Sequence, residues 1–309
     1  MTSMPSNTKT PKTSDAFRGM AYSVGSSFIY GLSFVFTKNI SDTYSPFTIL
    51  GWRFLIAFLA MELLRRLGVF RVNFRGKNLW HLLRLVFLFP LLYFIGETYG
   101  VQLTTASESG IVIAIIPVVT VGLSALILKE RASRTQMLGI IISTIGIILI
   151  VLSQSLSASL NIWGYIGLIT AVLTYSLYAV WLVQETSFSG LEKTYVMMMA
   201  AGIGFFGLAI IEHVMQGSIR SFWTMPLQDM EFLASILYLA LGSSVIAFFA
   251  SNRAIVLLGP SGAASYAGLS TLITIIASVL ILNESFGLWQ ILASILVLGG
   301  VYIANQPRR

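Results

Sequence analysis

Long runs of hydrophobic residues dominate this chain, and only short polar segments separate one run from the next. Each run is close to the ~20 residues that an α-helix needs to cross the hydrocarbon core of a bilayer. The strict alternation over segments of about ten residues that marks a transmembrane β-barrel is not seen. The pattern predicts ten transmembrane helices, over residues 18–40, 46–66, 81–103, 107–129, 135–153, 162–184, 192–212, 231–256, 262–282 and 287–305.

The polar segments leave no room for a soluble domain. Residues 1–17 are predicted to be a disordered tail, and residues 306–309 a short C-terminal tail. The longest linker, residues 213–230, has room for one turn or a short interfacial helix. The apolar run from residue 18 exceeds the 7–15 residues of a signal peptide, and no small-residue cleavage site follows it, so we expect it to be retained.

Composition supports an integral membrane protein that is all α-helical. Of the 309 residues, 56% are hydrophobic and 10% are charged, against about 25% charged in an ordinary soluble protein. Mean hydropathy is +0.84. A soluble enzyme or a disordered chain is therefore excluded, because too little charge is present to cover its surface.

The sequence offers little for catalysis or metal binding. Cysteine is absent, so disulfides, thiol nucleophiles and thiolate metal sites are excluded. His81 and His213 lie at opposite membrane boundaries and have no carboxylate at metal-ligand spacing. No Ser-His-Asp set, phosphate loop or His-Glu-x-x-His motif is present. We expect no cofactor, no metal site and no enzymatic activity.

Basic residues in the first half lie almost entirely on one side of the predicted membrane. On the other side only Lys38 is found. Because Lys and Arg are enriched in cytoplasmic loops, both termini are predicted to face the cytoplasm of a cell-membrane protein. The net charge of +7 is then explained by topology and contact with anionic lipid, and no nucleic-acid partner is expected. The twelve basic residues are Lys9, Lys12, Arg18, Arg65, Arg66, Arg71, Arg75, Lys77, Arg84, Lys129, Arg131 and Arg134.

The two halves of the chain are related by an internal repeat. The first helices of each half align 148 residues apart, pairing Tyr30 with Tyr178. Five helices in each half, over residues 18–154 and 155–305, would place the second half in the opposite orientation. Inverted repeats are typical of secondary transporters, whose substrate site lies near the membrane midplane. Polar and glycine positions repeat at an offset of 154, where Glu130, Gln136 and Gly146 become Glu284, Gln290 and Gly300.

These features resemble the drug/metabolite transporter superfamily, and specifically its ten-helix EamA-type families. The resemblance covers residues 18–305, and Asn283 and Ser285 depart from the first copy's Lys129 and Arg131. It implies transport of metabolites, often export, through a central cavity lined mainly by helices 1, 3, 4, 6, 8 and 9. The residues that carry it are Tyr30, Gly31, Lys38, Pro46, Arg53, Phe54, Leu126 to Arg131, Gln136, Gly139 and Gly146, with Glu284, Gln290 and Gly300.

Three ionisable residues fall inside the predicted helices rather than at their ends: Arg53, Glu97 and, less deeply, Arg253. Charge inside a bilayer costs about 2.5–3.5 kcal/mol per residue on insertion scales, so such residues are candidates for function. Arg53 and Glu97 are predicted at similar depth. They could form a structural ion pair, or Glu97 could bind a substrate amine or carry a coupling proton.

Polar residues recur at helical spacing on two equivalent helices. They predict the walls of a water-filled path, with hydrogen bonding between helices as the alternative. Tyrosine rings among them could contact an amine or an aromatic group. Together with Glu97, the candidate cavity residues are Tyr22, Ser26, Tyr30 and Ser33 in the first helix, Tyr93 in the third, Thr174, Tyr178 and Trp181 in the sixth, Asn252 in the eighth, and Tyr266 and Ser270 in the ninth.

Other residues are interpreted structurally. Glu108 suits the N-terminus of the fourth helix, and Glu130 and Glu284 suit the helices that follow them. Pro117 should kink the fourth helix. Small residues in the fifth helix could support a homodimer or packing within the chain: Gly139, Ser143 and Gly146. Four tryptophans are expected at the membrane interfaces: Trp80, Trp163, Trp223 and Trp289.

The sequence therefore predicts a secondary active transporter that moves small polar metabolites, such as amino acids or amines, by alternating access. Export is the predicted direction. The partners of this transporter would be the substrate, the lipid bilayer and a coupling proton or ion. A passive facilitator or channel is the first alternative. A membrane scaffold would not need two polar stripes, and an intramembrane enzyme would need a nucleophile and base that the chain lacks.

Overall fold

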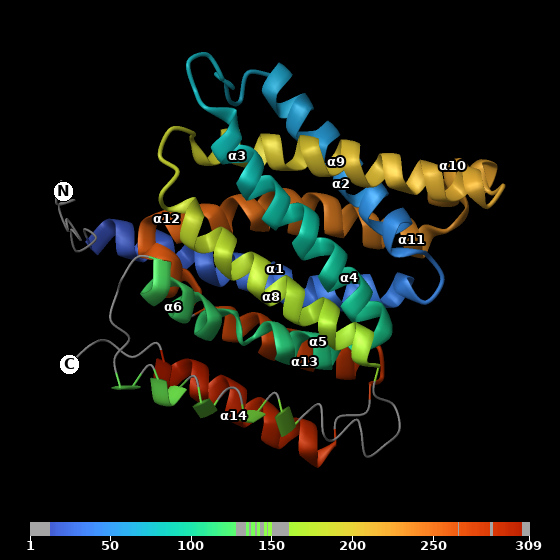
Figure 1. The fold of residues 1–309 in the computed structure, drawn as a ribbon. Helices are drawn as coiled ribbons and strands as arrows, with labels where there is room; N and C mark the ends of the chain where they lie inside the picture. Colours follow the sequence, from blue (N-terminus) through green and yellow to red (C-terminus); the bar gives the residue numbers. More distant parts are fainter. Residues whose placement is uncertain are drawn as a thin grey trace.

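The computed structural model describes residues 13–127, 161–264, 266–284 and 287–304, with scattered positions between 134 and 149. These residues form a bundle of helices (Figure 1). Seven helical segments in these ranges are long and apolar enough to cross a membrane, and two shorter apolar helices cover Gly268–Ile281 and Leu288–Ile303. Nine of the ten predicted segments are therefore helical, and the predicted segment 135–153 lies largely outside the described residues.

Most helix bounds follow the prediction closely, but the first helix begins at Thr13, inside the predicted disordered tail of residues 1–17, and the helix of the eighth span extends to Ala264, past the predicted start of the ninth helix at residue 262. The second predicted helix, 46–66, is α2 at Pro46–Arg66, where the Ser45 side chain accepts a hydrogen bond from Thr48 N and Pro46 begins the helix. The helices are α1 (Thr13–Ser41), α2 (Pro46–Arg66), α3 (Leu79–Val86), η1 (Phe87–Leu92), α4 (Tyr93–Leu103), α5 (Ala106–Ile113), α6 (Ile116–Ile127), α8 (Ile162–Leu182), α9 (Gly190–Met215), α10 (Ile219–Gln228), α11 (Met230–Leu237), η2 (Tyr238–Ala247), α12 (Phe248–Ala264), α13 (Ala267–Ile281) and α14 (Leu288–Ala304).

Several predicted spans are interrupted. The third is divided into α3, the π-helical η1 and α4, because Phe89 leaves the helical conformation (φ −143°, ψ 113°) just before Pro90. The eighth contains the π-helical η2, and Gly259 (φ 78°) bends it before Pro260. The expected kink in the fourth span lies between α5 and α6, next to Pro117. The linker 213–230 holds the expected short helix, α10.

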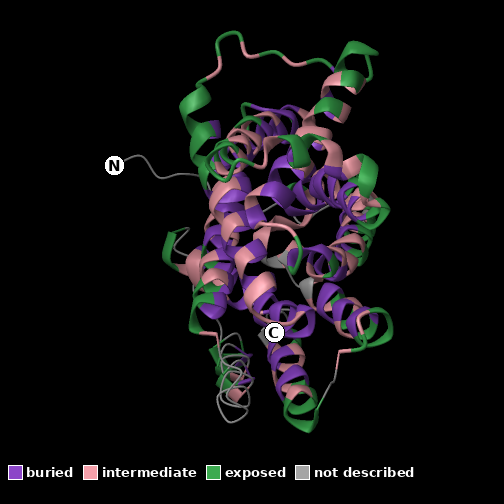
Figure 2. Cartoon of the chain, turned by 90° about the vertical axis from the view of Figure 1, so that its right-hand side faces the viewer, coloured by how far each residue is buried: buried purple, intermediate pink, exposed green. Residues whose placement is uncertain are grey.

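The helices pack so that α1 lies in contact with α12, η2 and α13, while α8 lies against α4 and α6. The helix pair α2 and α9 forms another extensive contact. Seen along the bundle, buried segments face its interior and exposed segments lie on the loops and outer faces (Figure 2). Many polar side chains, including Arg53 and Glu97, are buried in this interior as well. The centre of the bundle is therefore the candidate location of the functional site.

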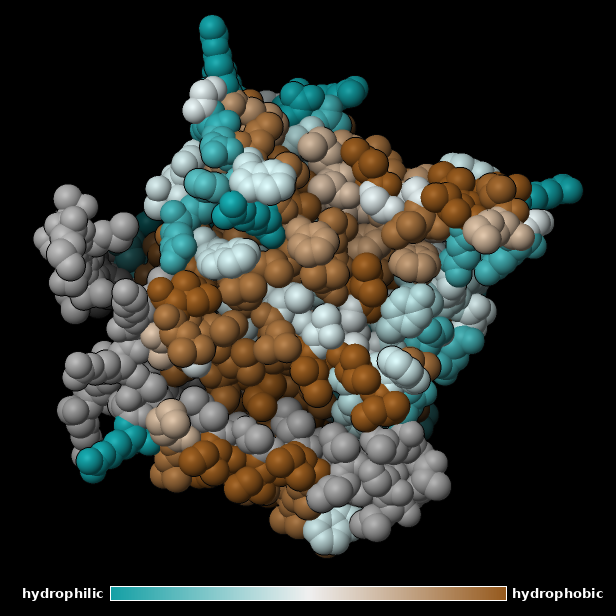
Figure 3. Space-filling view, viewed as in Figure 1, coloured by the Kyte–Doolittle hydropathy of each residue, from teal (hydrophilic) through white to brown (hydrophobic). Residues whose placement is uncertain are grey.

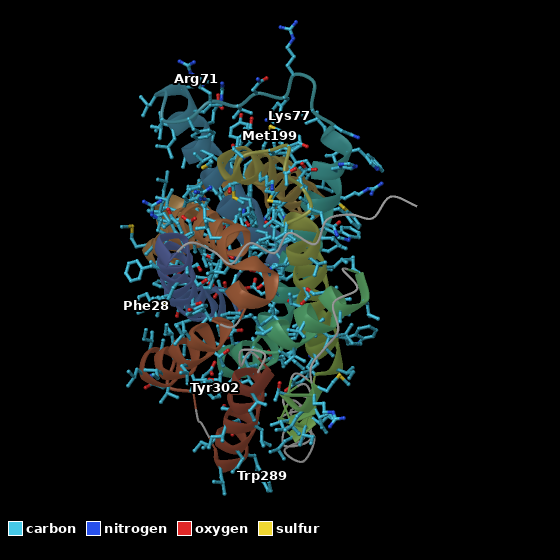
Figure 4. All side chains as sticks on the ribbon, turned by 90° about the vertical axis from the view of Figure 1, so that its left-hand side faces the viewer. Phe28, Arg71, Lys77, Met199, Trp289 and Tyr302 are labelled. Atoms are coloured by element: carbon cyan, nitrogen blue, oxygen red, sulfur yellow. The ribbon has the colours of Figure 1, made fainter. Side chains whose placement is uncertain are left out.

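The outer surface fits a bilayer. A broad apolar surface crosses the middle of one face, and hydrophilic residues lie mostly toward its edges (Figure 3). Trp80, Trp163, Trp223 and Trp289 are all more than half exposed, as expected for interfacial anchors. In the stick view Phe28 points outward from α1, and Trp289 and Tyr302 lie on α14 (Figure 4).

Carboxylates at helix ends include one unexpected contact. Glu108 forms the capping box of α5 with Thr105, which confirms its predicted place at a helix N-terminus. Among the described residues, the side-chain contacts of Glu284 are with α5 rather than with the helix that follows it. It accepts hydrogen bonds from Ala106 N (2.8 Å) and Ser107 N (3.1 Å), so it caps α5 of the first half. Glu130 lies outside the described residues.

At the end where α1 finishes, polar contacts join α1, α4 and the start of α11. Tyr44 donates to the Asp229 carboxylate (2.6 Å), which also caps α11 through Phe232 N. The Tyr44 hydrogen bond and the two backbone donors hold the pKa of Asp229 below its usual value. Gln102 of α4 donates to Ser41 O (2.6 Å). These contacts bring the helices together at this end of the bundle.

Candidate substrate cavity

A cavity of about 80 Å³ lies at the centre of the bundle. Residues of α1, α2, α4, α5, α6, α8, α12 and α13 line it, together with η1 and η2. Helices 1, 3, 4, 6, 8 and 9 of the predicted set are all included, and α2 adds Arg53. The polar lining residues are Ser23, Ser26, Ser27, Tyr30, Ser33, Arg53, Tyr93, Glu97, Tyr175, Ser243, Ser251 and Ser270.

One buried cation faces this cavity. Arg53 is only 1% exposed, and its guanidinium donates to Ser244 Oγ (2.8 Å) and Ser243 Oγ (2.9 Å) of η2. The same group lies 4.3 Å from the centroid of the Phe94 ring, within cation–π range. The guanidinium is thus held between α2, α4 and η2, and five N–H donors leave it capacity beyond these two hydroxyl partners.

One buried carboxylate faces the same cavity. Glu97 is 2% exposed, and its carboxylate accepts a long hydrogen bond from Thr98 Oγ1 (3.5 Å). Glu97 and Arg53 form no ion pair within 4.0 Å in the described chain, although both line the cavity. Of the two alternatives that the sequence left open, the direct ion pair is not formed in this structure, and the serines of η2 hold the guanidinium instead.

Aromatic rings occupy the middle of the site. Phe89 lies within 4.6–5.4 Å of five ring centroids and stacks nearly parallel on Phe248 (interplanar angle 9°). Its extended backbone conformation within η1 places the ring there. Pro90 is the one local signal of this interruption in the sequence. Because these rings fill most of the space, the cavity measures only about 80 Å³. Ligand sites usually measure about 300–1,000 Å³.

The polar stripe of α1 reaches the cavity through Ser26, Tyr30 and Ser33, and α4 and α13 contribute Tyr93 and Ser270. Tyr22 does not line it and instead packs edge-on against Phe249, with ring centroids 6.3 Å apart. Tyr266 does not line it either. At the start of α13 its backbone carbonyl accepts a hydrogen bond from Ser27 Oγ (3.0 Å).

The predicted stripe of α8 faces elsewhere. Thr174 donates to Thr170 O in its own helix (2.8 Å), and Trp181 lines a separate pocket at the end of α8. Tyr178 is fully buried and bonds to Asn252 Oδ1 (2.5 Å), whose amide reaches Thr194 Oγ1 (3.3 Å). Tyr178 and Asn252 thus join helices, which was the alternative interpretation. Tyr175 and Ala179, one turn apart, face the cavity in their place.

A metal site has no support within the described ranges, where no three His, Cys, Asp or Glu side chains lie close enough together to hold an ion. The cavity presents the guanidinium of Arg53, the carboxyl group of Glu97, aromatic rings and serine hydroxyl groups. Such groups can bind and orient a small charged solute.

Cysteine labelling can test this lining, because the natural chain has no cysteine. Ser26→Cys and Ser270→Cys should react with a polar, membrane-impermeant thiol reagent in detergent at least several-fold faster than Thr174→Cys and Tyr178→Cys. The first two positions border the cavity and the second two are packed between helices. Equal labelling of all four would contradict the assignment of the cavity.

Comparison with known proteins identifies the family. An uncharacterized transporter of Bacillus subtilis, YcxC, is 30% identical over 281 residues, which is 90% of each chain. An uncharacterized transporter of Archaeoglobus fulgidus is 25% identical over 291 residues, covering 90% of this chain and 95% of its own. A solved crystal structure with 18% identity shares the fold over 94% of this chain and 95% of its own, at a TM-score of 0.60. The EamA-like transporter family profile matches residues 17–152 and 162–306, and the chain therefore belongs to this family of membrane transporters.

Proposed function

We propose that this transporter is a secondary active carrier that exports small zwitterionic or amine-bearing metabolites such as amino acids. The observation that carries the proposal is one buried guanidinium and one buried carboxylate that face the same cavity without pairing directly. A solute with a carboxylate and an ammonium group would satisfy both. The rings of Tyr93 and Phe89 and the serines of α1 would contact the rest of the solute.

Alternating access between two inverted halves, residues 18–154 and 155–305, is part of this proposal. Its support is the packing pattern, in which α1 contacts α12 and α13 as α8 contacts α4 and α6. The family profile also matches twice, once in each half. In the proposed repeat, α1 of the first half corresponds to α8 of the second, so the contacts of α1 with α12 and α13 correspond to those of α8 with α4 and α6. The cavity lies between these helices.

The arrangement fits a conformation closed at the end where α1 finishes. Glu284 bound to α5, and Gln102 bound to Ser41 O, hold the helices together there. The cavity lining reaches toward the opposite, predicted cytoplasmic end through Ser23, Pro260 and Ala263. At 80 Å³ it must expand to admit a metabolite, which requires movement of the rings around Phe89.

The test is transport by the purified full-length protein in proteoliposomes. A thermal-shift screen against amino acids, amines and nucleosides would first select ligands. Accumulation of a radiolabelled ligand against its gradient, driven by an imposed proton or sodium gradient, is expected of a secondary active carrier. Equilibration without accumulation under every gradient would favour the passive facilitator instead.

Both termini are proposed to lie in the cytoplasm. Reporter fusions after residue 188 should be active in the cytoplasm and inactive outside, and fusions after residue 158 should give the reverse. Both expectations follow from the twelve basic residues that the first half places on one side. The opposite pattern at either position would overturn the ten-helix arrangement.

A homodimer is not required by the small residues of the predicted fifth helix. A side chain at Gly146 would meet Val297 Cγ2 at 2.7 Å, so this glycine serves contact with α14 within the chain. Ser143 lies outside the described residues.

A further inference from the structure

A second pocket lies away from the central cavity, at the predicted cytoplasmic end of the bundle. It measures about 340 Å³, and α3 and the end of α8 enclose it. Its lining residues are His81, Arg84, Leu85, Trp181, Gln184 and Glu185. Hydrophilic residues gather over this part of the surface and border the apolar belt (Figure 3). The transport proposal assigns no role to this pocket.

The pocket places basic and acidic side chains side by side. His81 Nδ1 lies 3.4 Å from Glu185 Oε2. Arg84 follows one turn after His81 on the same face of α3 and has no ion pair with a described carboxylate. Its guanidinium lies 5.8 Å from the Trp80 ring centroid. Donors for a phosphate and an acceptor for an ammonium group are therefore within reach of one small headgroup.

The Glu185 carboxylate is fixed in place rather than mobile. Its side chain is 7% exposed, and Oε1 accepts a hydrogen bond from Ser187 N (2.7 Å). Lys193, buried on α9, donates to the backbone carbonyls of Glu185 and Leu182 and so holds the end of α8. Oε2 is left facing the pocket beside His81. The Glu185 carboxylate is therefore a hydrogen-bond acceptor whose position is determined by its burial and by the contacts of α8 and α9.

The membrane-facing side of α3 continues from polar to apolar. Trp80, beside the pocket, is 59% exposed, as expected at a headgroup boundary. Leu83, farther along α3, is 48% exposed, and Phe87, the first residue of η1, is 57% exposed. Phe87 lies about 9 Å deeper than His81 at the helical rise per residue. Phe87 follows Arg84 by three residues, so the exposed apolar strip adjoins the pocket on the side of Arg84. A phosphate-binding side chain beside such a strip matches a phospholipid better than a soluble metabolite.

We propose that this pocket binds a phospholipid whose headgroup carries a primary amine, such as phosphatidylethanolamine. Arg84 and His81 bind the phosphate, and Glu185 accepts hydrogen bonds from the ammonium group. The acyl chains lie along Leu83 and Phe87. Because the pocket joins α3 of the first half to α8 of the second half, the bound lipid stabilises this packing of the two halves.

The lipid's amine is the discriminating feature. A choline headgroup carries the same charge but has no N–H to donate to Glu185, and a glycerol headgroup has no positive charge. Charge-assisted hydrogen bonds are roughly twice as strong as neutral ones. We therefore expect phosphatidylethanolamine to bind about tenfold tighter than phosphatidylcholine with the same acyl chains.

Direct binding tests this on the purified full-length protein in detergent. Dioleoyl phosphatidylethanolamine, phosphatidylglycerol and phosphatidylcholine are titrated separately, and bound lipid is counted by native mass spectrometry. Glu185→Gln, which keeps an acceptor for Ser187 N, should remove the preference for ethanolamine over choline. Arg84→Gln should weaken all three lipids about tenfold, since all contain phosphate. Arg75→Gln, an equal charge loss in the exposed loop before α3, should change none of them.

Several outcomes would overturn the proposal. Equal binding of the three lipids to the wild type, or an equal loss in Arg75→Gln and Arg84→Gln, would leave only general surface charge. Displacement of the lipid by an equal concentration of free phosphoethanolamine would assign the pocket to a soluble solute. Arg84 lies on an exposed helix face, so its variant keeps the test decisive even where Glu185→Gln does not fold. None of these measurements depends on transport.

Discussion

Glu97→Gln is expected to abolish transport while the protein still folds and inserts. The substitution keeps the size of the side chain and its hydrogen-bonding capacity but removes its charge. In the proposed complex Glu97 pairs with the ammonium group of the substrate. Losing one partner of such a buried, hydrogen-bonded charge pair costs about 2–5 kcal/mol, so transport of a cationic or zwitterionic substrate should fall at least ~30-fold. Initial uptake rates in proteoliposomes, normalised to the amount of folded protein, provide the measurement.

Folding should survive because the Glu97 carboxylate forms no ion pair with Arg53, which is held by Ser243 and Ser244. Removing the carboxylate therefore leaves no cation without its hydrogen-bond partners. Glu231→Gln is the matched control, since Glu231 is exposed and bonds to Asn39 at a helix end. It should transport at a rate close to that of the wild type.

Two results would change the role of Glu97. Should Glu97→Gln lose accumulation but keep exchange of substrate across the membrane, the carboxylate carries a coupling proton and does not anchor the substrate. Should the variant misfold and Arg53→Gln in the same chain restore folding, the two residues act as a structural pair. Wild-type accumulation by Glu97→Gln would exclude both functional roles.

The helix bounds could be predicted because bilayer thickness and local end signals determine them. Ser45 and Pro46 mark the start of α2, and Arg65 and Arg66 mark its end. That Arg53 and Glu97 lie at similar levels of their helices could be predicted for the same reason, and both line one cavity. Length and charge are properties of one segment and need no knowledge of its neighbours.

The faces of the helices could not be predicted as well. Thr174 and Tyr178 have the spacing of a polar stripe, yet α8 turns Tyr175 and Ala179 toward the cavity. Thr174 can bond to its own backbone, and Tyr178 finds Asn252 on another helix, so spacing alone does not reveal which face is open. The contact of Glu284 with α5 joins residues about 177 positions apart and has no local signature.

Close backbone contact between the halves is the other feature with a large expected effect. Gly96 and Gly100 of α4 face Gly164 and Gly167 of α8, as small residues do where transmembrane helices approach closely. A side chain at Gly167 would meet Gly96 O at 2.7 Å, and one at Gly96 would overlap Gly167 O even more closely. A carbonyl oxygen within a helix cannot turn aside as the end of a flexible side chain can.

Gly96→Ala is therefore expected to destabilise the protein by about 3 kcal/mol, at the upper end of ordinary overpacking. The midpoint of thermal unfolding, followed by tryptophan fluorescence in detergent, should fall by about 5 °C or more. Gly122→Ala in α6 makes the same chemical change where the new methyl group meets no atom within 4 Å, and it should leave the midpoint nearly unchanged.

The same substitution should also reduce transport in the fraction that folds, because separating α4 from α8 moves Glu97 relative to Tyr175 across the cavity. Equal midpoints for Gly96→Ala and Gly122→Ala would mean that α4 and α8 do not meet at these glycines. A lowered midpoint with normal transport per folded molecule would mean that the contact supports the fold without setting the geometry of the site. A loss of both is expected, since the glycine contact and the Glu97 carboxylate are adjacent on one helix.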